Sequence, residues 1–171
     1  YTVEPTNILE LLPKFDDGLE ISKLSIHKQF SSDWNWTQES FIHPTLPQFT
    51  FKLFGTPNKN DNATIEIQNI EVYQENESQP HQIIKTSAIP MITENYVAFK
   101  IEDFNFDGYK DISLMQFTAL VNAQYIYWLF DPNTGDFVYN ESFSEMITSP
   151  CEIDLENHFI LSYWQWNAID Q

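Results

Sequence analysis

An acidic segment of nine residues, 103–111, lies between two stretches of alternating hydrophobic residues, and this arrangement constrains the fold most. Before it, Val97, Phe99 and Ile101 occupy every second position. After it, residues 112–117 run Ile-Ser-Leu-Met-Gln-Phe. Both flanking stretches have the pattern of β-strands, in which successive side chains point to opposite faces. The sequence therefore predicts two strands joined by an acidic loop.

The loop has the spacing of a calcium-binding loop. It runs Asp-Phe-Asn-Phe-Asp-Gly-Tyr-Lys-Asp, with oxygen-bearing side chains at positions 1, 3, 5 and 9 and glycine at position 6. Calcium takes six to eight oxygen ligands, and alternate residues of a tightly wound loop direct theirs to one point. The predicted side-chain ligands are therefore Asp103, Asn105, Asp107 and Asp111, and the backbone carbonyl of Tyr109 is the ligand predicted at position 7.

Two features distinguish this loop from an EF-hand. Its flanks predict strands rather than helices, and its twelfth position is Leu114 instead of a bidentate glutamate. The alternative is an acidic β-turn without metal, because Asp, Asn and Gly also favour turns. Four spaced oxygen donors together with Gly108 favour calcium over that alternative.

Short strands separated by turns account for most of the chain. Besides the two strands that flank the loop, strands are expected over residues 48–54, 63–73, 82–87, 124–130, 137–139 and 159–164. We expect a long loop over 31–48, a polar turn over 55–62 and a short helix over 142–146 that Ser142 caps. Residues 1–171 then form a single all-β, mostly antiparallel domain, either propeller-like or a sandwich.

The charge of the chain is strongly one-sided. The 171 residues have a net charge of −17, and all eight basic residues are lysines. A chain without basic patches is not expected to bind nucleic acid, and an acidic surface attracts cationic partners. The alternative is that the acidity only keeps the protein soluble. The hydrophobic runs are short, so no membrane span is expected.

Catalytic patterns have little support in the sequence. Cys151 is the single cysteine, and no neighbouring cation lowers the pKa of its thiol. The four histidines lie at positions 27, 43, 81 and 158, without the spacing of a local metal site, and no nucleophile-elbow motif is present. We therefore expect a protein that is not an enzyme. A hydrolase whose site has no recognisable motif is the alternative.

From about residue 95 to 168 the chain resembles a bacterial exported family. The similarity rests on the loop at 103–111, the segment Tyr125-Ile-Tyr-Trp-Leu-Phe-Asp-Pro132 and the hairpin partner Gly135-Asp-Phe-Val138. The family includes periplasmic immunity proteins that inhibit lysozyme-like peptidoglycan hydrolases delivered by type IV secretion systems. Where the family has Arg and Gly after its last matched strand, this chain has Gln165 and Asn167.

The resemblance implies a calcium-stabilised immunity protein that binds and inhibits a cationic peptidoglycan hydrolase in the periplasm. It also implies that the calcium ligands are those that the loop spacing predicts. The chain begins at Tyr1 without methionine, as expected of a processed or a trimmed form, and removal of an export signal is compatible with this start. A looser similarity to the calcium loops of FG-GAP and VCBS repeats implies the alternative, a surface or adhesion module that binds protein or glycan.

Aromatic residues in two polar stretches are candidates for partner contact. Exposed Trp and Tyr are typical anchors of protein interfaces. The candidates are Trp34, Trp36, Tyr163, Trp164 and Trp166. The alternative is that Trp34, Trp36 and Trp164 belong to the hydrophobic core, where large aromatic side chains are usually found.

Overall fold

The computed structural model describes residues 34–58, 61–93, 96–118, 122–146, 148–149 and 151–162. These residues form thirteen strands and one short helix. The bounds are β1 Trp34–Phe41, β2 Gln48–Asn58, β3 Asp61–Gln74, β4 Gln82–Ala88, β5 Ile92–Thr93, β6 Tyr96–Val97, β7 Phe99–Glu102, β8 Asp111–Thr118, β9 Ala123–Asp131, β10 Asp136–Tyr139, α1 Glu141–Met146, β11 Thr148–Ser149, β12 Cys151–Asp154 and β13 Phe159–Ser162.

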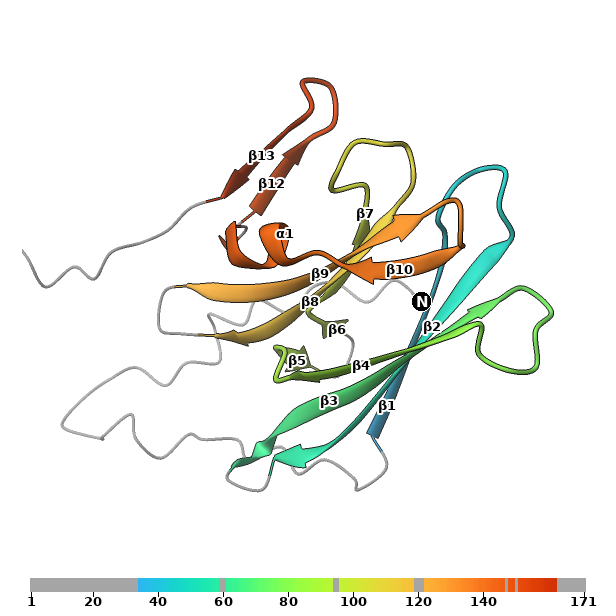
Figure 1. Ribbon diagram of the computed structural model, residues 1–171. Helices are drawn as coiled ribbons and strands as arrows, with labels where there is room; N and C mark the ends of the chain where they lie inside the picture. The colour runs from blue at the N-terminus through green and yellow to red at the C-terminus, as the bar shows by residue number, and fades with distance from the viewer. Residues whose placement is uncertain are drawn as a thin grey trace, which may run out of the picture.

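The strands form two main antiparallel sheets (Figure 1). The first has the order β1-β2-β3-β4, and the second has the order β10-β9-β8-β7, with β11 added beside β9. Two short ribbons, β5–β6 and β12–β13, complete the structure. The predicted all-β, antiparallel class is confirmed. In the described part of the chain, no helix has the length and hydrophobicity needed to cross a membrane.

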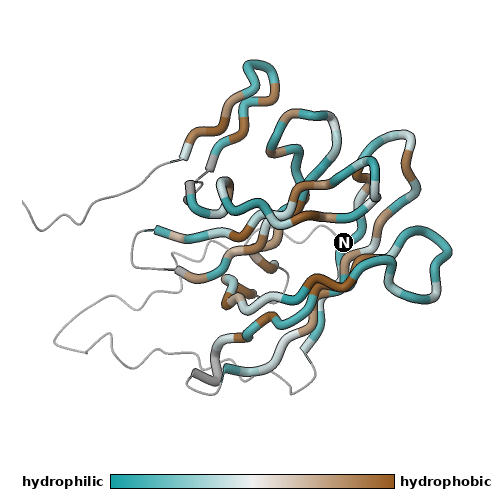
Figure 2. Tube along the Cα trace, viewed as in Figure 1, coloured by the Kyte–Doolittle hydropathy of each residue, from teal (hydrophilic) through white to brown (hydrophobic). Residues whose placement is uncertain are grey.

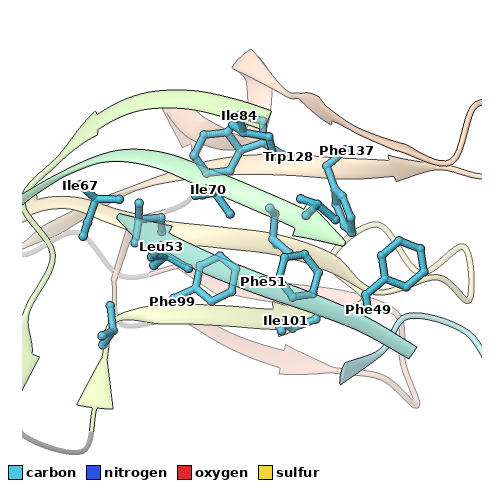
Figure 3. Close-up of a cluster of buried hydrophobic side chains, with 14 of the residues drawn as sticks. Phe49, Phe51, Leu53, Ile67, Ile70, Ile84, Phe99, Ile101, Trp128 and Phe137 are labelled. Atoms are coloured by element: carbon cyan, nitrogen blue, oxygen red, sulfur yellow. The ribbon is translucent and has the colours of Figure 1, made fainter. Parts of the chain in front are cut away.

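The two sheets bury a common core (Figure 3). From the first sheet, Phe49, Phe51 and Leu53 of β2 point inward and are almost completely buried. The ring centroid of Phe51 lies 5.7 Å from that of Phe99 and 5.5 Å from that of Phe137, both from the second sheet. The alternation that predicted β2 therefore places its hydrophobic side chains against the facing sheet.

Strand β3 shows why its hydrophobic residues change phase in the sequence. Ile65 and Ile67 fall on odd positions and Ile70 on an even one, yet all three are completely buried. Ile67 lies opposite Gly55 whereas Asn69 lies opposite Phe54, so one extra residue of β3 bulges out of the ladder. A β-bulge moves the following side chains to the other face. The bulge thus directs both halves of β3 into one core.

Gly55 is required where this bulge brings the two strands close together. A Cβ atom at this position would lie 2.8 Å from the carbonyl oxygen of Glu66 and would overlap the side chain of Ile65. Because backbone cannot move aside as a flexible side chain does, we expect Gly55→Ala to lower the free energy of unfolding by about 1–3 kcal/mol. Urea unfolding monitored by tryptophan fluorescence measures this loss.

Gly135→Ala is the matched comparison for Gly55→Ala. Gly135 has a φ of +81°, but the nearest atom to a Cβ there is 3.6 Å away. Alanine at this position meets only the backbone strain of the left-handed region. Equal stability of Gly55→Ala and the wild type would contradict the close approach of β2 and β3.

The prediction of a loop over residues 31–48 is wrong for residues 34–41, which form strand β1. β1 pairs with β2 from Trp34 opposite Gly55 to Phe41 opposite Gln48. It is an edge strand, and its inward-facing residues after Trp36 are polar. An edge strand with polar inward positions lacks the alternation from which strands are predicted. The turn expected over 55–62 is also too long, since β2 continues to Asn58 and β3 begins at Asp61.

The short helix is present, but Ser142 does not cap it. Asn140 precedes α1, and its side-chain oxygen accepts a hydrogen bond of 2.9 Å from the backbone nitrogen of Phe143. This is the N-cap geometry, in which the capping residue stands just outside the helix. Ser144 instead turns toward β9, where its hydroxyl oxygen accepts a hydrogen bond of 3.0 Å from the backbone nitrogen of Tyr127. The helix is therefore fastened to the outer face of the second sheet.

Candidate metal centre

The acidic loop joins β7 to β8, whose pairing ends at Glu102 opposite Asp111 (Figure 1). Contacts of Tyr109 and Lys110 hold the C-terminal part of the loop in place. The ring of Tyr109 is stacked on Phe130 with centroids 5.5 Å apart and on His43 with centroids 4.6 Å apart. The backbone nitrogen of Lys110 donates a hydrogen bond of 2.9 Å to the carbonyl of Ile42. The loop is thus held between the two sheets at one end of the molecule.

Inside the loop, the predicted ligands accept hydrogen bonds from its own backbone. The carboxylate of Asp103 accepts from the nitrogens of Asp107 and Gly108, at 3.2 and 2.9 Å. The amide oxygen of Asn105 accepts from Asp107 at 3.1 Å, and the carboxylate of Asp107 accepts from Tyr109 at 2.8 Å. The backbone is therefore wound around the side chains at positions 1, 3 and 5.

Two residues of the loop have the left-handed backbone conformation. Gly108 has a φ of +91° and Phe106 a φ of +61°. Glycine adopts this conformation without steric penalty, whereas a bulky residue rarely does. The position of Gly108 agrees with the glycine that the loop spacing requires for a sharp turn. A contact with the β12–β13 ribbon accompanies the unusual conformation of Phe106, whose ring is stacked on His158 with centroids 5.4 Å apart.

Asp111 links the loop to the second sheet. Its side chain is completely buried. One carboxylate oxygen accepts a hydrogen bond of 2.9 Å from the nitrogen of Phe104, and the other accepts one of 2.8 Å from the nitrogen of Phe130. Phe104 is the second residue of the loop, and Phe130 lies near the end of β9. The Asp111 side chain thus joins the start of the loop to two strands.

The electrostatic state of Asp111 differs from that of an aspartate in an ordinary turn. Burial raises its pKa from 3.8 to about 7 against the opposing effect of the two amides, and the carboxylates of Asp107 and Asp103 add to the increase. Turn residues Asp131 and Asp154 have lowered pKa values, because Asn133 and Asn157, respectively, donate hydrogen bonds to them. Near neutral pH, Asp111 therefore carries charge only at the expense of stability.

No protein cation compensates this charge within the ranges that the structure describes. The close contact between a basic and an acidic side chain found there joins Nε2 of His81 to a carboxylate oxygen of Asp136 at 3.3 Å, and does not involve Asp111. Within the same ranges, no three His, Cys, Asp or Glu side chains converge closely enough to hold a metal ion by themselves. The donors that surround the loop are nonetheless all oxygens, from three carboxylates, one amide and one backbone carbonyl. This donor chemistry fits a hard cation such as calcium.

In calcium-free solution, we expect the contribution of Asp111 to the free energy of unfolding to decrease as pH rises from about 4 to about 7. The pKa of Asp111 is about 7 in the folded state and near 3.8 when unfolded, so the native state binds more protons in this interval. The stabilising contribution of Asp111 is therefore complete below the pKa that it has in the unfolded chain. It is lost as pH rises through the pKa that it has in the folded protein. Urea unfolding of the wild type and of Asp111→Asn, compared across this range, isolates the contribution of Asp111. A pH-independent difference between them would contradict the raised pKa.

The predicted partner-binding residues are only partly described. Trp34 and Trp36 lie in β1, half-buried and packed against the main core. The indole nitrogen of Trp36 is buried and has no hydrogen-bond partner within the described residues. Both side chains thus contribute to the core, the alternative that the sequence left open. Tyr163, Trp164 and Trp166 lie outside the described residues, and the role of all five in binding remains a prediction.

Sequence reasoning missed a second small core on the outer face of the second sheet. It contains Phe104, Met115 and Tyr127, and Phe143 of α1 and Ile160 of β13 pack against it. A signal for strand β12 was present, because residues 151–154 alternate as Cys-Glu-Ile-Asp, but this run is only four residues long and follows a proline. The β12–β13 ribbon therefore stands beside the acidic loop, although some forty positions separate them in the chain (Figure 1).

Comparisons with protein-family models, with curated proteins and with solved structures found no match.

Proposed function

We propose that the loop at 103–111 binds one calcium ion that stabilises the end of the molecule where β7, β8 and β9 meet. The observation that carries this proposal is the buried carboxylate of Asp111. It has no cation beside it among the described residues and lies close enough to Asp103 and Asp107 to be destabilised by them. A divalent cation would convert this mutual repulsion into attraction. Asp103, Asn105, Asp107, Asp111 and the carbonyl of Tyr109 would hold it.

We further propose that the protein is a periplasmic immunity protein. In this function, its calcium-stabilised domain binds a cationic peptidoglycan hydrolase and blocks access to the active site. The net charge of −17 supports a cationic partner, since opposite charges steer the two proteins together. The motif resemblance supports the class of partner. A loop that lacks the usual glutamate at its twelfth position is expected to bind calcium weakly. Such a loop suits the periplasm, which lies outside the cytoplasmic membrane and is supplied with calcium.

Capture and inhibition together test this function. The protein is immobilised with calcium present and exposed to lysate of the source organism, and the captured proteins are identified by mass spectrometry. We expect recovery of a basic peptidoglycan hydrolase, whose hydrolysis of purified peptidoglycan then decreases as the protein is added. Recovery of surface proteins or glycans instead would favour the adhesion module.

The role of charge in this encounter is measured by ionic strength. We expect the association rate of the protein with the captured hydrolase to fall by at least tenfold between 10 mM and 500 mM NaCl, because salt screens steering between oppositely charged surfaces. Stopped-flow fluorescence measures this rate. An association rate that is independent of salt would contradict a role of the acidic surface in binding.

A further inference from the structure

We propose that a groove between the acidic loop and the β12–β13 ribbon is the surface that receives the partner, and that it takes a hydrophobic side chain from a segment rich in Lys or Arg. This inference rests on the proposed function, because it names the contact surface of the same partner. The groove has a volume of about 510 Å³. Its lining includes Phe104, Asn105 and Phe106 from the loop, Phe143 from α1, and Phe159 and Ile160 from β13.

The ribbon exposes hydrophobic side chains beside this groove. Ile153 and Ile160 pack against the second core, whereas Phe159 and Leu161 remain 41% and 40% exposed. Figure 2 shows hydrophobic residues along both strands of the ribbon, which projects from the rest of the molecule. Phe159 also lines a second hollow with Leu155, which is 58% exposed. Exposed hydrophobic groups gathered beside a hollow indicate an interaction site.

The acidic loop forms one wall of the groove. Phe104 donates its backbone N–H to Asp111, and the ring of Phe106 is stacked on His158 of the ribbon. Both residues lie between predicted calcium ligands at positions 1, 3 and 5. A cation that fixes those ligands therefore also fixes the aromatic wall. This connection explains how calcium binding would prepare the surface for a partner.

The charge around the groove selects a cationic partner. The loop 103–111, the helix 141–146 and the ribbon 151–162 together carry eight carboxylates and one lysine, Lys110, a formal charge of −7. One bound calcium ion would leave −5. A second copy of this acidic chain and an anionic lipid surface would both be repelled. A segment with Lys or Arg beside a hydrophobic residue matches both the charge of the rim and the apolar lining.

A short peptide tests the groove independently of any hydrolase. The probe is a labelled Lys-Lys-Phe-Lys-Lys peptide, with calcium in excess and low salt, and binding is measured by fluorescence anisotropy. We expect Phe159→Ser to weaken binding by roughly ten- to hundredfold, because a buried phenylalanine contact is lost. The matched control is Ile83→Ser on β4, where Ile83 is 49% exposed and lies outside the groove lining. This control should bind as the wild type does.

The controls separate hydrophobic recognition from charge alone. Thermal melting establishes that both variants are folded, as expected for side chains that are partly exposed. Leu161→Ser, on the same strand but outside the groove lining, is a second control and should bind as the wild type does. Equal affinity for Lys-Lys-Phe-Lys-Lys and Lys-Lys-Ser-Lys-Lys would overturn the groove, because binding would then depend on charge alone. A dimer detected by light scattering that Phe159→Ser dissociates would also overturn it, since a second copy would occupy the surface.

The hydrolase then distinguishes this inference from the proposed function. Inhibition by the wild type that Phe159→Ser abolishes supports both. Inhibition that survives Phe159→Ser overturns the groove and leaves the immunity function in place. Peptide binding that requires Phe159, without capture or inhibition of any hydrolase, supports the groove as a site for cationic segments and overturns the immunity function.

Discussion

Asp111→Ala is expected to destabilise the protein by roughly 2–4 kcal/mol even when no calcium is present. The substitution removes both oxygens that accept hydrogen bonds from the nitrogens of Phe104 and Phe130, and both bonds are buried. An unsatisfied buried donor costs about 1–3 kcal/mol. Removing an unfavourable buried charge offsets part of this loss. The net effect remains a loss, because two donors are left unpaired.

Urea unfolding in the presence of EGTA measures this effect, and two variants calibrate it. Asp111→Asn keeps one acceptor oxygen and should lose less stability than Asp111→Ala. Asp107→Ala removes the acceptor of an exposed hydrogen bond from Tyr109, so water can replace it and the calcium-free loss should be small. If Asp111→Ala is no less stable than Asp107→Ala without calcium, the side chain does not join the loop to β9.

The sequence was sufficient to predict the elements whose stabilising contacts are local or strongly patterned. The strand expected over residues 124–130 is confirmed as β9, and its side chains enter both hydrophobic cores. The strand expected over 137–139 is confirmed as β10, which pairs with β9, and the turn between them is closed by local hydrogen bonds from the backbone nitrogens of Asn133 and Asp136. The loop between β7 and β8 was also predicted at its observed position, since alternation on both sides defines where each strand ends.

Features that depend on distant residues could not be predicted. The bond from Phe130 to Asp111 spans nineteen positions, and no spacing rule relates a loop carboxylate to the far end of a later strand. Strand β1 depends on pairing with β2 rather than on its own polar inward face. The groove is formed by three segments that meet only in the folded molecule. The sequence therefore did not indicate that the exposed hydrophobic residues of β13 lie beside a groove.

Calcium is expected to raise the melting temperature of the wild type by roughly 3–10 °C. Calcium loops of extracellular modules bind with dissociation constants of about 0.1–1 mM, so calcium at about 10 mM stabilises the folded state by about 1.4–2.7 kcal/mol. For a domain of this size, each kcal/mol corresponds to about 2–4 °C. Because Leu114 replaces the closing glutamate and is completely buried in the core, we expect the weaker end of this affinity range.

Asp103→Ala and Asp107→Ala should each abolish most of the calcium-dependent shift. Each removes a predicted ligand, and differential scanning calorimetry with calcium or EGTA measures the shift directly. Asp154→Ala is the matched control, because Asp154 is also a turn carboxylate that accepts backbone hydrogen bonds, from Glu156 and Asn157, but lies outside the loop. Its variant should melt lower than the wild type and keep the full calcium shift. If calcium leaves the wild-type melting temperature unchanged, the loop is an acidic turn, and the buried charge of Asp111 is then balanced by its two amide donors alone.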